Sequence, residues 1–336
     1  MEVLNDLVMS VIDNLFNRWK EEDKRALLSS DDLRPTPLLK ITTRLDRSND
    51  KHGTNLHQNS AIIYNRVPKT GSTSFVGLAY DLCSKNKFNV LHVNISKNSH
   101  ILSLSDQFRF TSNVTEWVTK KPSFYHGHMA YLDFSKFGFN SPLYINIIRK
   151  PLDRMVSYYY FLRFGDDFRP HLVRKKQGDK KTFDECVKEG RPECDPNNLW
   201  LQVPFFCGQH ADCWIPGNNW AVEQAKRNLM EKYLLVGVTE QMEEFIAVLE
   251  ATIPSFFKGA LKLYRQGSKS HLRKTNKKIE PSNETIAQFK QSNIWKLEND
   301  FYDFALRHFE SVKSRTLDSN LNDRGQLFFY EKIRPK

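Results

Sequence analysis

The chain has 336 residues, 40% of them hydrophobic and 24 of them phenylalanine, so it can bury a large core in one main domain with appendages. A formal net charge of +11 favours a polyanionic partner: nucleic acid, an anionic membrane or a sulfated glycan. Nucleic acid is disfavoured because the sequence has no helix-turn-helix, zinc-finger or RNP-type motif. No segment approaches the roughly 20 apolar residues of a membrane span.

Apolar residues near the N-terminus recur every three to four positions, which predicts an amphipathic helix, either a coiled-coil stem or a helix packed on the body. They are Leu4, Leu7, Val8, Val11, Ile12, Leu15, Phe16 and Trp19. We predict a helical stem segment over residues 1–43, a polar linker over 44–60 and the main domain over 61–336. No basic-then-apolar signal peptide is evident.

Residues 61–75 read AIIYNRVPKTGSTSF, which predicts a strand, a loop and the start of a helix. Pro68 ends the strand, and Gly71 allows a tight turn that an anion can approach closely. The hydroxyl residues after Gly71 are good capping residues, so the helix directs its first N–H groups into the loop, where Lys69 adds a positive charge. The expected anion contacts are Lys69, Thr70, Gly71, Ser72, Thr73 and Ser74.

The order of lysine and glycine distinguishes this loop from that of nucleotide triphosphatases, in which the lysine follows a second glycine. No acidic residue is evident at the end of a later strand to hold magnesium. A magnesium-dependent nucleotide kinase is therefore the weakest interpretation. A plain Gly/Ser/Thr turn without a ligand is the structural alternative, and the apolar segments on both sides of the loop argue against it.

The rest of the chain predicts an α/β fold with a central, mostly parallel sheet flanked by helices. Expected strands are 61–67, 88–93, 123–127, 143–149 and 233–238, and expected helices are 72–85, 104–118, 152–163, 240–251 and 284–312. Ligands of such sheets bind at the carboxyl ends of the strands. Arg149 ends one strand, and its planar fork suits a phosphate. His126 and His128 end another strand and face the same way in an extended chain.

The cysteines indicate an oxidising compartment. Two pairs, Cys186 with Cys194 and Cys207 with Cys213, flank short polar loops and lack the spacing of a zinc site, so they predict local disulfides, although four cysteines allow three pairings. Cys83 is expected to be a buried free thiol. Glycosylation sequons begin at Asn94, Asn113 and Asn283. Together these features favour the secretory pathway.

Several segments together resemble the heparan sulfate 2-O-sulfotransferases over about residues 60–336. They are YNRVPKT at 64–70, FYHGH at 124–128, SYYYFLRFGDD at 157–167, KQGDKKTFDEC at 176–186, SHLRKT at 270–275 and FFYEKI at 328–333. Two alternatives stay open: the related uronyl 2-O-sulfotransferase of dermatan and chondroitin, and a non-catalytic heparan-binding protein on the same scaffold. The chain departs from the family pattern at Lys150, where an acidic residue is usual, and in lacking the family's membrane anchor.

The resemblance implies a P-loop-like sulfotransferase fold and transfer of a sulfuryl group from 3′-phosphoadenosine 5′-phosphosulfate (PAPS), without a metal, to the 2-hydroxyl of iduronate and less so glucuronate. His128 would be the general base, His126 an assisting residue and Lys69 the clamp on the sulfuryl and leaving phosphate oxygens. Arg149 and Ser157 would bind the 3′-phosphate. A loop closing over the adenosine would supply Tyr264, Ser270, Arg273, Thr275 and Lys278. The acceptor would contact Arg66, Tyr80, His92, Arg169, Arg174 and Lys332.

The family pattern also implies the sequential disulfide pairing, a homotrimer and glycosylation at Asn94 and Asn113. It places the protein in the Golgi lumen as a type II membrane protein, with the anchor expected to be missing from this chain.

Overall fold

The computed structural model describes residues 60–95, 99–166, 169, 171–267 and 277–317. Its strands form one parallel sheet in the order β2-β3-β1-β4-β5. They are β1 (Ala61–Asn65), β2 (Asn89–His92), β3 (Ser123–Gly127), β4 (Leu143–Ile148) and β5 (Tyr233–Val238). The predicted α/β fold and parallel sheet are confirmed. The predicted stem 1–43 and the linker 44–60, except its last residue, lie outside the described residues.

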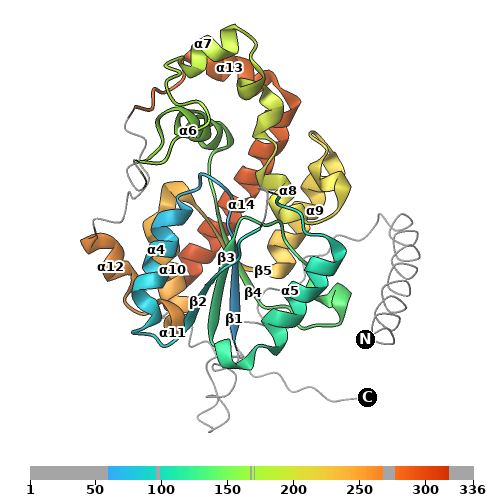
Figure 1. The fold of residues 1–336 in the computed structure, drawn as a ribbon, viewed down its shortest axis with the longest axis vertical. Coiled ribbons are helices and arrows are strands. Elements are labelled where there is room, and N and C mark those ends of the chain that lie inside the picture. The colour runs from blue at the N-terminus through green and yellow to red at the C-terminus, as the bar shows by residue number, and fades with distance from the viewer. Residues whose placement is uncertain (1–59, 96–98, 167–168, 170, 268–276, 318–336) are drawn as a thin grey trace. The chain divides into compact units, whose positions relative to one another are not determined.

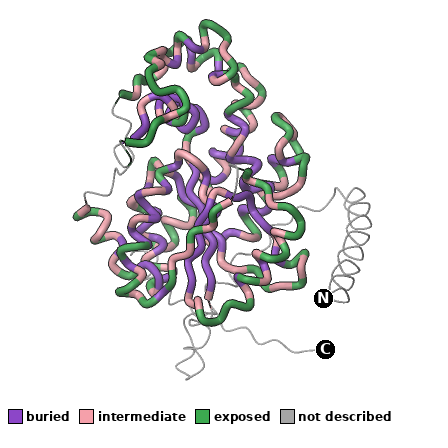
Figure 2. Tube along the Cα trace, in the orientation of Figure 1, coloured by how far each residue is buried: buried purple, intermediate pink, exposed green. Residues whose placement is uncertain are grey.

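Helices cover both faces of the sheet, which is why β1 is buried along its whole length and reads as a continuous apolar run (Figures 1 and 2). One side carries α4 (Ser72–Cys83), α10 (Met242–Thr252), α11 (Pro254–Phe257) and α12 (Ala260–Gln266), and the other carries α5 (Leu104–Glu116), α8 (Gln202–Cys207) and α9 (Asn219–Lys232). The long helix α14 (Asn293–Leu317) packs against β5, α9 and α10.

A second apolar cluster lies beyond the carboxyl ends of the strands, at the top of Figure 1. It joins α6 (Pro151–Phe164), α7 (Phe183–Lys188) and α13 (Asn283–Gln291). The disulfide Cys186–Cys194 lies within this cluster, and Cys207–Cys213 follows α8, so the sequential pairing is formed. Short 3-10 turns connect the elements: η2 (Val118–Lys120), η3 (Phe134–Phe137), η4 (Pro192–Cys194), η5 (Pro196–Leu199), η6 (Ala211–Trp214) and η7 (Thr239–Gln241).

Three expectations about local structure were wrong. The helix predicted over 284–312 is two helices, because Ser292 adopts an extended backbone and its carbonyl accepts the first hydrogen bond of α14 from Lys296 (3.1 Å), as an N-cap residue does. Helices α7, α8, α9, α11 and α12 were not predicted; all but α9 are short, and α9 has a weak apolar pattern. Cys83 is free but only half-buried. Across the described ranges, we find no helix with the length and apolar character needed to span a membrane.

Candidate active site

The phosphate loop connects β1 to α4 through a glycine in the left-handed conformation. Gly71 has φ +73° and is itself the N-cap of α4, so the expectation that Ser72 and Thr73 cap the helix was wrong. A Cβ at Gly71 would come 2.9 Å from Met242 Cε. The left-handed conformation therefore favours glycine here, whereas the Met242 methyl is the end of a flexible side chain and could shift. The helix start points its first N–H groups and its positive dipole end into the loop.

Two side chains shape the loop itself. The hydroxyl of Thr70 is buried and donates to the Val67 carbonyl (3.0 Å), which closes the loop internally. Lys69 also has a positive φ of 69°, an uncommon conformation for a residue with a side chain. Its Nζ lies 4.2 Å from the centroid of the Phe161 ring on α6. The loop thus presents a positive charge beside the helix that carries Ser157, which is buried.

The sheet topology brings Arg149 to the same place. β1 and β4 are neighbours, but the chain leaves β1 toward β2 and β3 on one side and leaves β4 toward β5 on the other. Such a switch point opens a crevice at the carboxyl ends of the two strands, where ligands of α/β proteins bind. Arg149 follows β4, and its Nη1 donates a long hydrogen bond of 3.5 Å to the Lys69 carbonyl. The two predicted phosphate motifs are therefore adjacent.

A buried polar network holds the main chain of Arg149. Gln202 on α8 accepts from the Arg149 N–H (2.9 Å) and donates to its carbonyl (2.9 Å). Glu298 on α14 is fully buried and accepts from the N–H groups of Leu201 (2.8 Å) and Val203 (3.1 Å), on either side of that glutamine. Burial raises the pKa of Glu298 to about 7, against the lowering effect of Arg154. The network fixes the strand end from which the arginine side chain leaves.

His128 follows β3 and is oriented by the main chain of Arg66. Its Nδ1 lies 2.8 Å from the Arg66 carbonyl oxygen. A carbonyl can only accept, so Nδ1 carries the proton and the lone pair of the neutral ring is on Nε2. A general base needs this arrangement: one ring nitrogen held by a fixed acceptor and the other able to take a proton.

His126 lies in a different environment, although it is only two residues away. Its ring is buried, stacks on His92 of β2 (centroids 4.7 Å apart) and hydrogen-bonds through Nε2 to the Tyr80 hydroxyl (3.0 Å). Burial and, after it, the positive charge of Arg66 together lower the pKa of His126 to about 3. His126 is thus neutral over the physiological range. It joins two predicted acceptor residues, Tyr80 and His92, into one cluster.

Two of the cations predicted to bind the acceptor, Arg66 and Arg169, act on these histidines, and Arg174 lies beside the loop that follows β1. Burial, then Arg66 and Arg169, lower the pKa of His92, so both arginines act electrostatically on the end of β2. Arg174 is held by the buried carboxylate of Asp166 at 3.5 Å and stacks on Phe161, with its Cζ 4.4 Å from the ring centroid. The structure therefore brings Arg66, Tyr80, His92, Arg169 and Arg174 around the ends of β1, β2 and β3.

Some predicted site residues are not part of this constellation. Ser270, Arg273, Thr275 and Lys332 lie outside the described residues. Tyr264 lies on α12, and Lys278 pairs with Glu280 (2.7 Å). Asn94 and Asn113 are both exposed, as a glycosylation acceptor must be.

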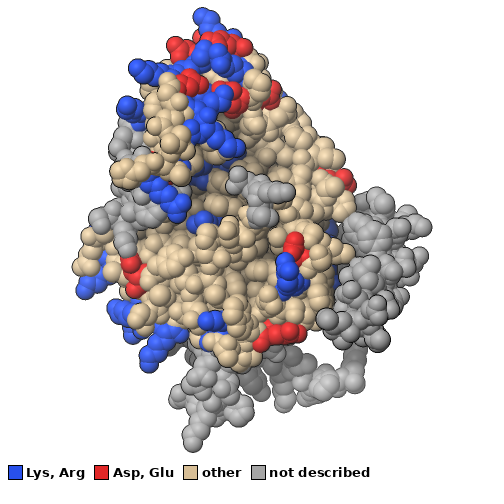
Figure 3. Space-filling view, viewed as in Figure 1, with Lys and Arg blue, Asp and Glu red and all other residues tan. Residues whose placement is uncertain are grey.

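The surface around the site is charged. Figure 3 shows Lys and Arg side chains concentrated near α6 and α7, beyond the strand ends, with Asp and Glu among them. The exposed cations of the connection after α6 are Arg169, Lys175, Lys176 and Lys180. Within the described part of the chain, no group of three or more His, Cys, Asp or Glu side chains could hold a metal ion.

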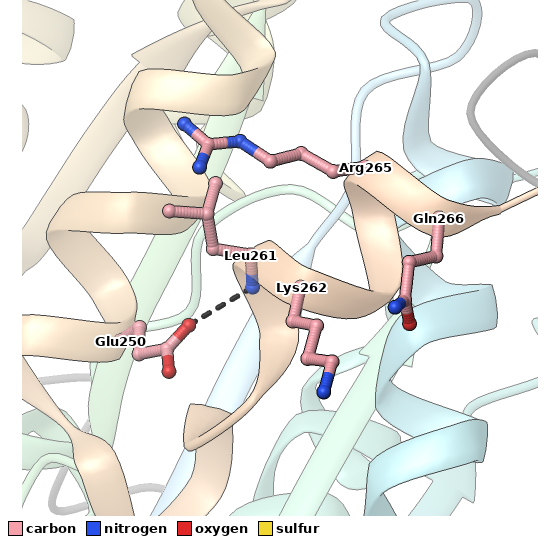
Figure 4. Close-up of a pocket in the computed structure, with 5 residues that line it drawn as sticks. All are labelled: Glu250, Leu261, Lys262, Arg265 and Gln266. Atoms are coloured by element: carbon pink, nitrogen blue, oxygen red, sulfur yellow. Dashed lines mark hydrogen bonds between the residues drawn. The ribbon is translucent and has the colours of Figure 1, made fainter.

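A separate pocket of about 460 Å³ lies between α10 and α12 (Figure 4). Its lining residues are Glu250, Leu261, Lys262, Arg265 and Gln266. The carboxylate of Glu250 already accepts from the N–H groups of Gly259 (2.7 Å) and Leu261 (2.9 Å), and Arg265 pairs with Glu243 (2.7 Å). Two of the three charged side chains of this pocket, Glu250 and Arg265, are therefore used to hold α12.

Three residues of the site were missed by sequence reasoning. Phe161 lies inside the SYYYFLRFGDD segment, but nothing in that segment marks its contact with Lys69. Gln202 has no local signal. Glu298 did have a signal in the sequence, because it lies between Ile294 and Phe301 in the apolar stripe of α14. A carboxylate at such a position must find buried partners.

Comparison with known proteins agrees with this geometry. A model of the sulfotransferase family matches residues 52–305. The chain is 59% identical over 283 residues to heparan sulfate 2-O-sulfotransferase 1 of Homo sapiens, covering 83% of this chain and 80% of that protein. It is 61% identical over 279 residues to the Gallus gallus protein of the same name (82% and 78%). It is 55% identical over 307 residues to heparin sulfate O-sulfotransferase of Drosophila melanogaster (89% and 87%). With a lysine-first phosphate loop and an arginine at the neighbouring strand end, the chain belongs to the sulfotransferase family.

Proposed function

We propose that the protein transfers a sulfuryl group from PAPS to the 2-hydroxyl of uronic acid residues, iduronate in preference to glucuronate, in heparan sulfate. The substrate class comes from the relatives, which are named for it at 55–61% identity. The observation that carries the catalytic part is the tautomer of His128. The Arg66 carbonyl fixes the proton on Nδ1, so that Nε2 can act as the base.

The proposed transfer is a single in-line displacement. His128 Nε2 takes the proton of the 2-hydroxyl as that oxygen forms a bond to sulfur, and the bond from sulfur to the 5′-phosphate oxygen breaks. Lys69 stabilises the negative charge that develops on the departing phosphate. The products are the 2-O-sulfated sugar, 3′-phosphoadenosine 5′-phosphate (PAP) and protonated His128, which returns its proton to solvent.

The donor is doubly anionic at both ends, and the two phosphate motifs match it. The loop from Lys69 to Ser74 would hold the 5′-phosphosulfate through N–H groups and the lysine. Arg149 and Ser157 would hold the 3′-phosphate. The fit rests on the start of α4 directly after Gly71, which has the left-handed conformation, and on the 3.5 Å contact between Arg149 Nη1 and the Lys69 carbonyl. Tyr264, Ser270, Arg273, Thr275 and Lys278 are proposed for the adenosine.

The acceptor would lie on the other side of His128. The proposed contacts are Arg66, Tyr80, His92, Arg169, Arg174 and Lys332. Their positive charges suit the carboxylate and sulfates of the polymer. His126 would act by positioning: a ring with a pKa of about 3 stays neutral and holds the Tyr80 hydroxyl at 3.0 Å.

The test is incubation of the purified protein with radiolabelled PAPS and either 2-O-desulfated heparin or dermatan, followed by disaccharide analysis. We expect label on the uronic acid 2-position of heparin. His128→Ala should lower the rate by about 10²–10⁴-fold, the usual contribution of a general base. His210→Ala is the matched control, because this histidine lies directly before η6, beside Asp212.

Each other outcome overturns a stated part of the proposal. Transfer to dermatan alone would assign the uronyl enzyme of that polymer. Heparin binding without transfer would leave a binding protein on the same scaffold. Full activity of His128→Ala would exclude it as the base.

The compartment and assembly are proposed with the function. The two disulfides and the exposed side chains of Asn94 and Asn113 support an oxidising compartment of the secretory pathway. We propose the Golgi lumen as that compartment and a type II membrane protein as the form in which the protein resides there. A mobility shift on glycosidase digestion of protein made in a eukaryotic cell, lost in the double variant N94Q/N113Q, checks this. The homotrimer is checked by light scattering after size-exclusion chromatography; a monomer would contradict it.

A further inference from the structure

The ring of Phe161 lies against two of the cations that the proposed reaction uses. Lys69 Nζ is 4.2 Å from the ring centroid, and Arg174 Cζ is 4.4 Å from the same centroid. Phe161 is half-buried on α6, four residues after Ser157, so these two side chains lie on the same helix face. One aromatic ring therefore contacts both the donor-side lysine and the acceptor-side arginine.

Arg174 is confined by further contacts. Its side chain is only 10% exposed, and the buried carboxylate of Asp166 lies 3.5 Å away. Gly165 has φ +70°, and a Cβ at this position would come 3.0 Å from Arg174 Nε. The guanidinium is thus enclosed by a carboxylate, a side-chain-free backbone and the Phe161 ring.

The arrangement has an electrostatic reason. The face of an aromatic ring carries negative potential and attracts a lysine or arginine cation held within about 6 Å. Two cations close to one ring repel each other, and the attraction of the ring to each offsets part of that repulsion. An aliphatic residue of similar volume would fill the same space without this attraction.

Resting on the proposed function, we propose that Phe161 is a positioning residue that fixes Lys69 and Arg174 relative to each other. Through them it sets the separation between the sulfuryl group on the donor and the hydroxyl on the acceptor. Misplacement of reacting groups by about 1 Å can cost 10²-fold in rate. The effect of losing the ring should therefore appear in kcat more than in the KM for either substrate.

The test compares wild type, Phe161→Leu and the conservative Phe161→Tyr in sulfate transfer to 2-O-desulfated heparin. Leucine should lower kcat by about 10-fold to 100-fold, with Tm close to that of wild type, and tyrosine should restore the rate. A second series places mono-, di- and trifluorinated phenylalanine at position 161. Fluorine leaves the shape nearly unchanged but weakens the negative ring face stepwise, so log kcat should fall stepwise.

The outcomes separate the two proposals. An active wild type with no trend across the fluorinated series, or with a leucine variant of unchanged kcat, would overturn the role of Phe161 and leave the proposed function standing. A fall in kcat that only follows a fall in Tm would assign a packing role. A wild type that transfers no sulfate would overturn the proposed function and this inference together.

Discussion

Replacing Glu298 with glutamine isolates the buried carboxyl that supports the Arg149 strand end. Glutamine has nearly the same shape, its side-chain oxygen can still accept from the Leu201 and Val203 N–H groups, and it does not titrate. It therefore resembles the protonated carboxyl. The comparison between the two proteins as a function of pH reports the ionisation of this one group.

The structure sets the size and sign of the effect. Burial raises the pKa of Glu298 from 4.5 to about 7, so the folded protein binds this proton more tightly than the unfolded chain does. The contribution to stability is fully present below pH 4.5 and is lost as the pH rises through 7. At 1.36 kcal/mol per unit of pKa, the loss amounts to about 3 kcal/mol.

The assay is urea unfolding followed by tryptophan fluorescence at several pH values between 4 and 8. We expect the free energy of unfolding of Glu298→Gln, relative to wild type, to rise by about 3 kcal/mol across that range. Any cost of the substitution that does not depend on pH cancels when the values of this relative free energy at two pH values are compared. Glu280→Gln, at an exposed position, controls for the substitution itself. A difference that stays constant with pH would refute the argument that burial controls this carboxyl.

Three further substitutions test the site. Gly71→Ala should weaken PAP binding and lower stability by about 1–2 kcal/mol, because the residue has φ +73°; calorimetry and thermal unfolding measure both. Gln202→Ala removes both hydrogen bonds to the Arg149 main chain, so it should weaken PAP binding by about 1–3 kcal/mol, measured by the same titration. His126→Gln should tolerate acid better than wild type. The pKa of His126 is about 3 in the folded protein and 6.5 in the unfolded chain, so the stability that the neutral ring contributes is lost as the pH falls below 6.5. The loss amounts to about 1.36 kcal/mol for each pH unit, and the glutamine variant does not undergo it.

Each of these has a contrary result. Normal PAP affinity of Gly71→Ala would show that the loop tolerates a side chain, and the same result for Gln202→Ala would show that Arg149 needs no support. Parallel stability curves of His126→Gln and wild type between pH 4 and 7 would show that His126 protonates in the folded state as it does in the unfolded chain. Gly178→Ala, with φ +94° and no atom within 4 Å of its Cβ position, is the control for backbone conformation at Gly71.

The elements that depend on local spacing were predictable. The apolar runs at 61–67 and 143–149 are each followed directly by their own strand-to-helix connection, so hydrophobic periodicity and the Gly and Pro residues between elements identify them. The alternation of strands and helices predicts a parallel sheet, and this places both predicted phosphate motifs at the edge where the strands end. The same logic failed at Ser292, where a capping residue broke a continuous apolar pattern, and over α9, whose pattern is weak.

Sequence by itself determined the loop between β1 and α4, the strand that Arg149 follows, the histidine pair and the cysteine loops, because each is a short pattern with its own chemistry. Only the tertiary structure decided which side chains these site residues contact. The Gln202 amide meets the Arg149 carbonyl across 53 residues of sequence and Glu298 across 96. Phe161 on α6 meets Lys69 in the loop that follows β1. These contacts follow from the strand order β2-β3-β1-β4-β5. That order is set by packing across the whole domain rather than by any local pattern, because each buried polar group must find its partner in the assembled core.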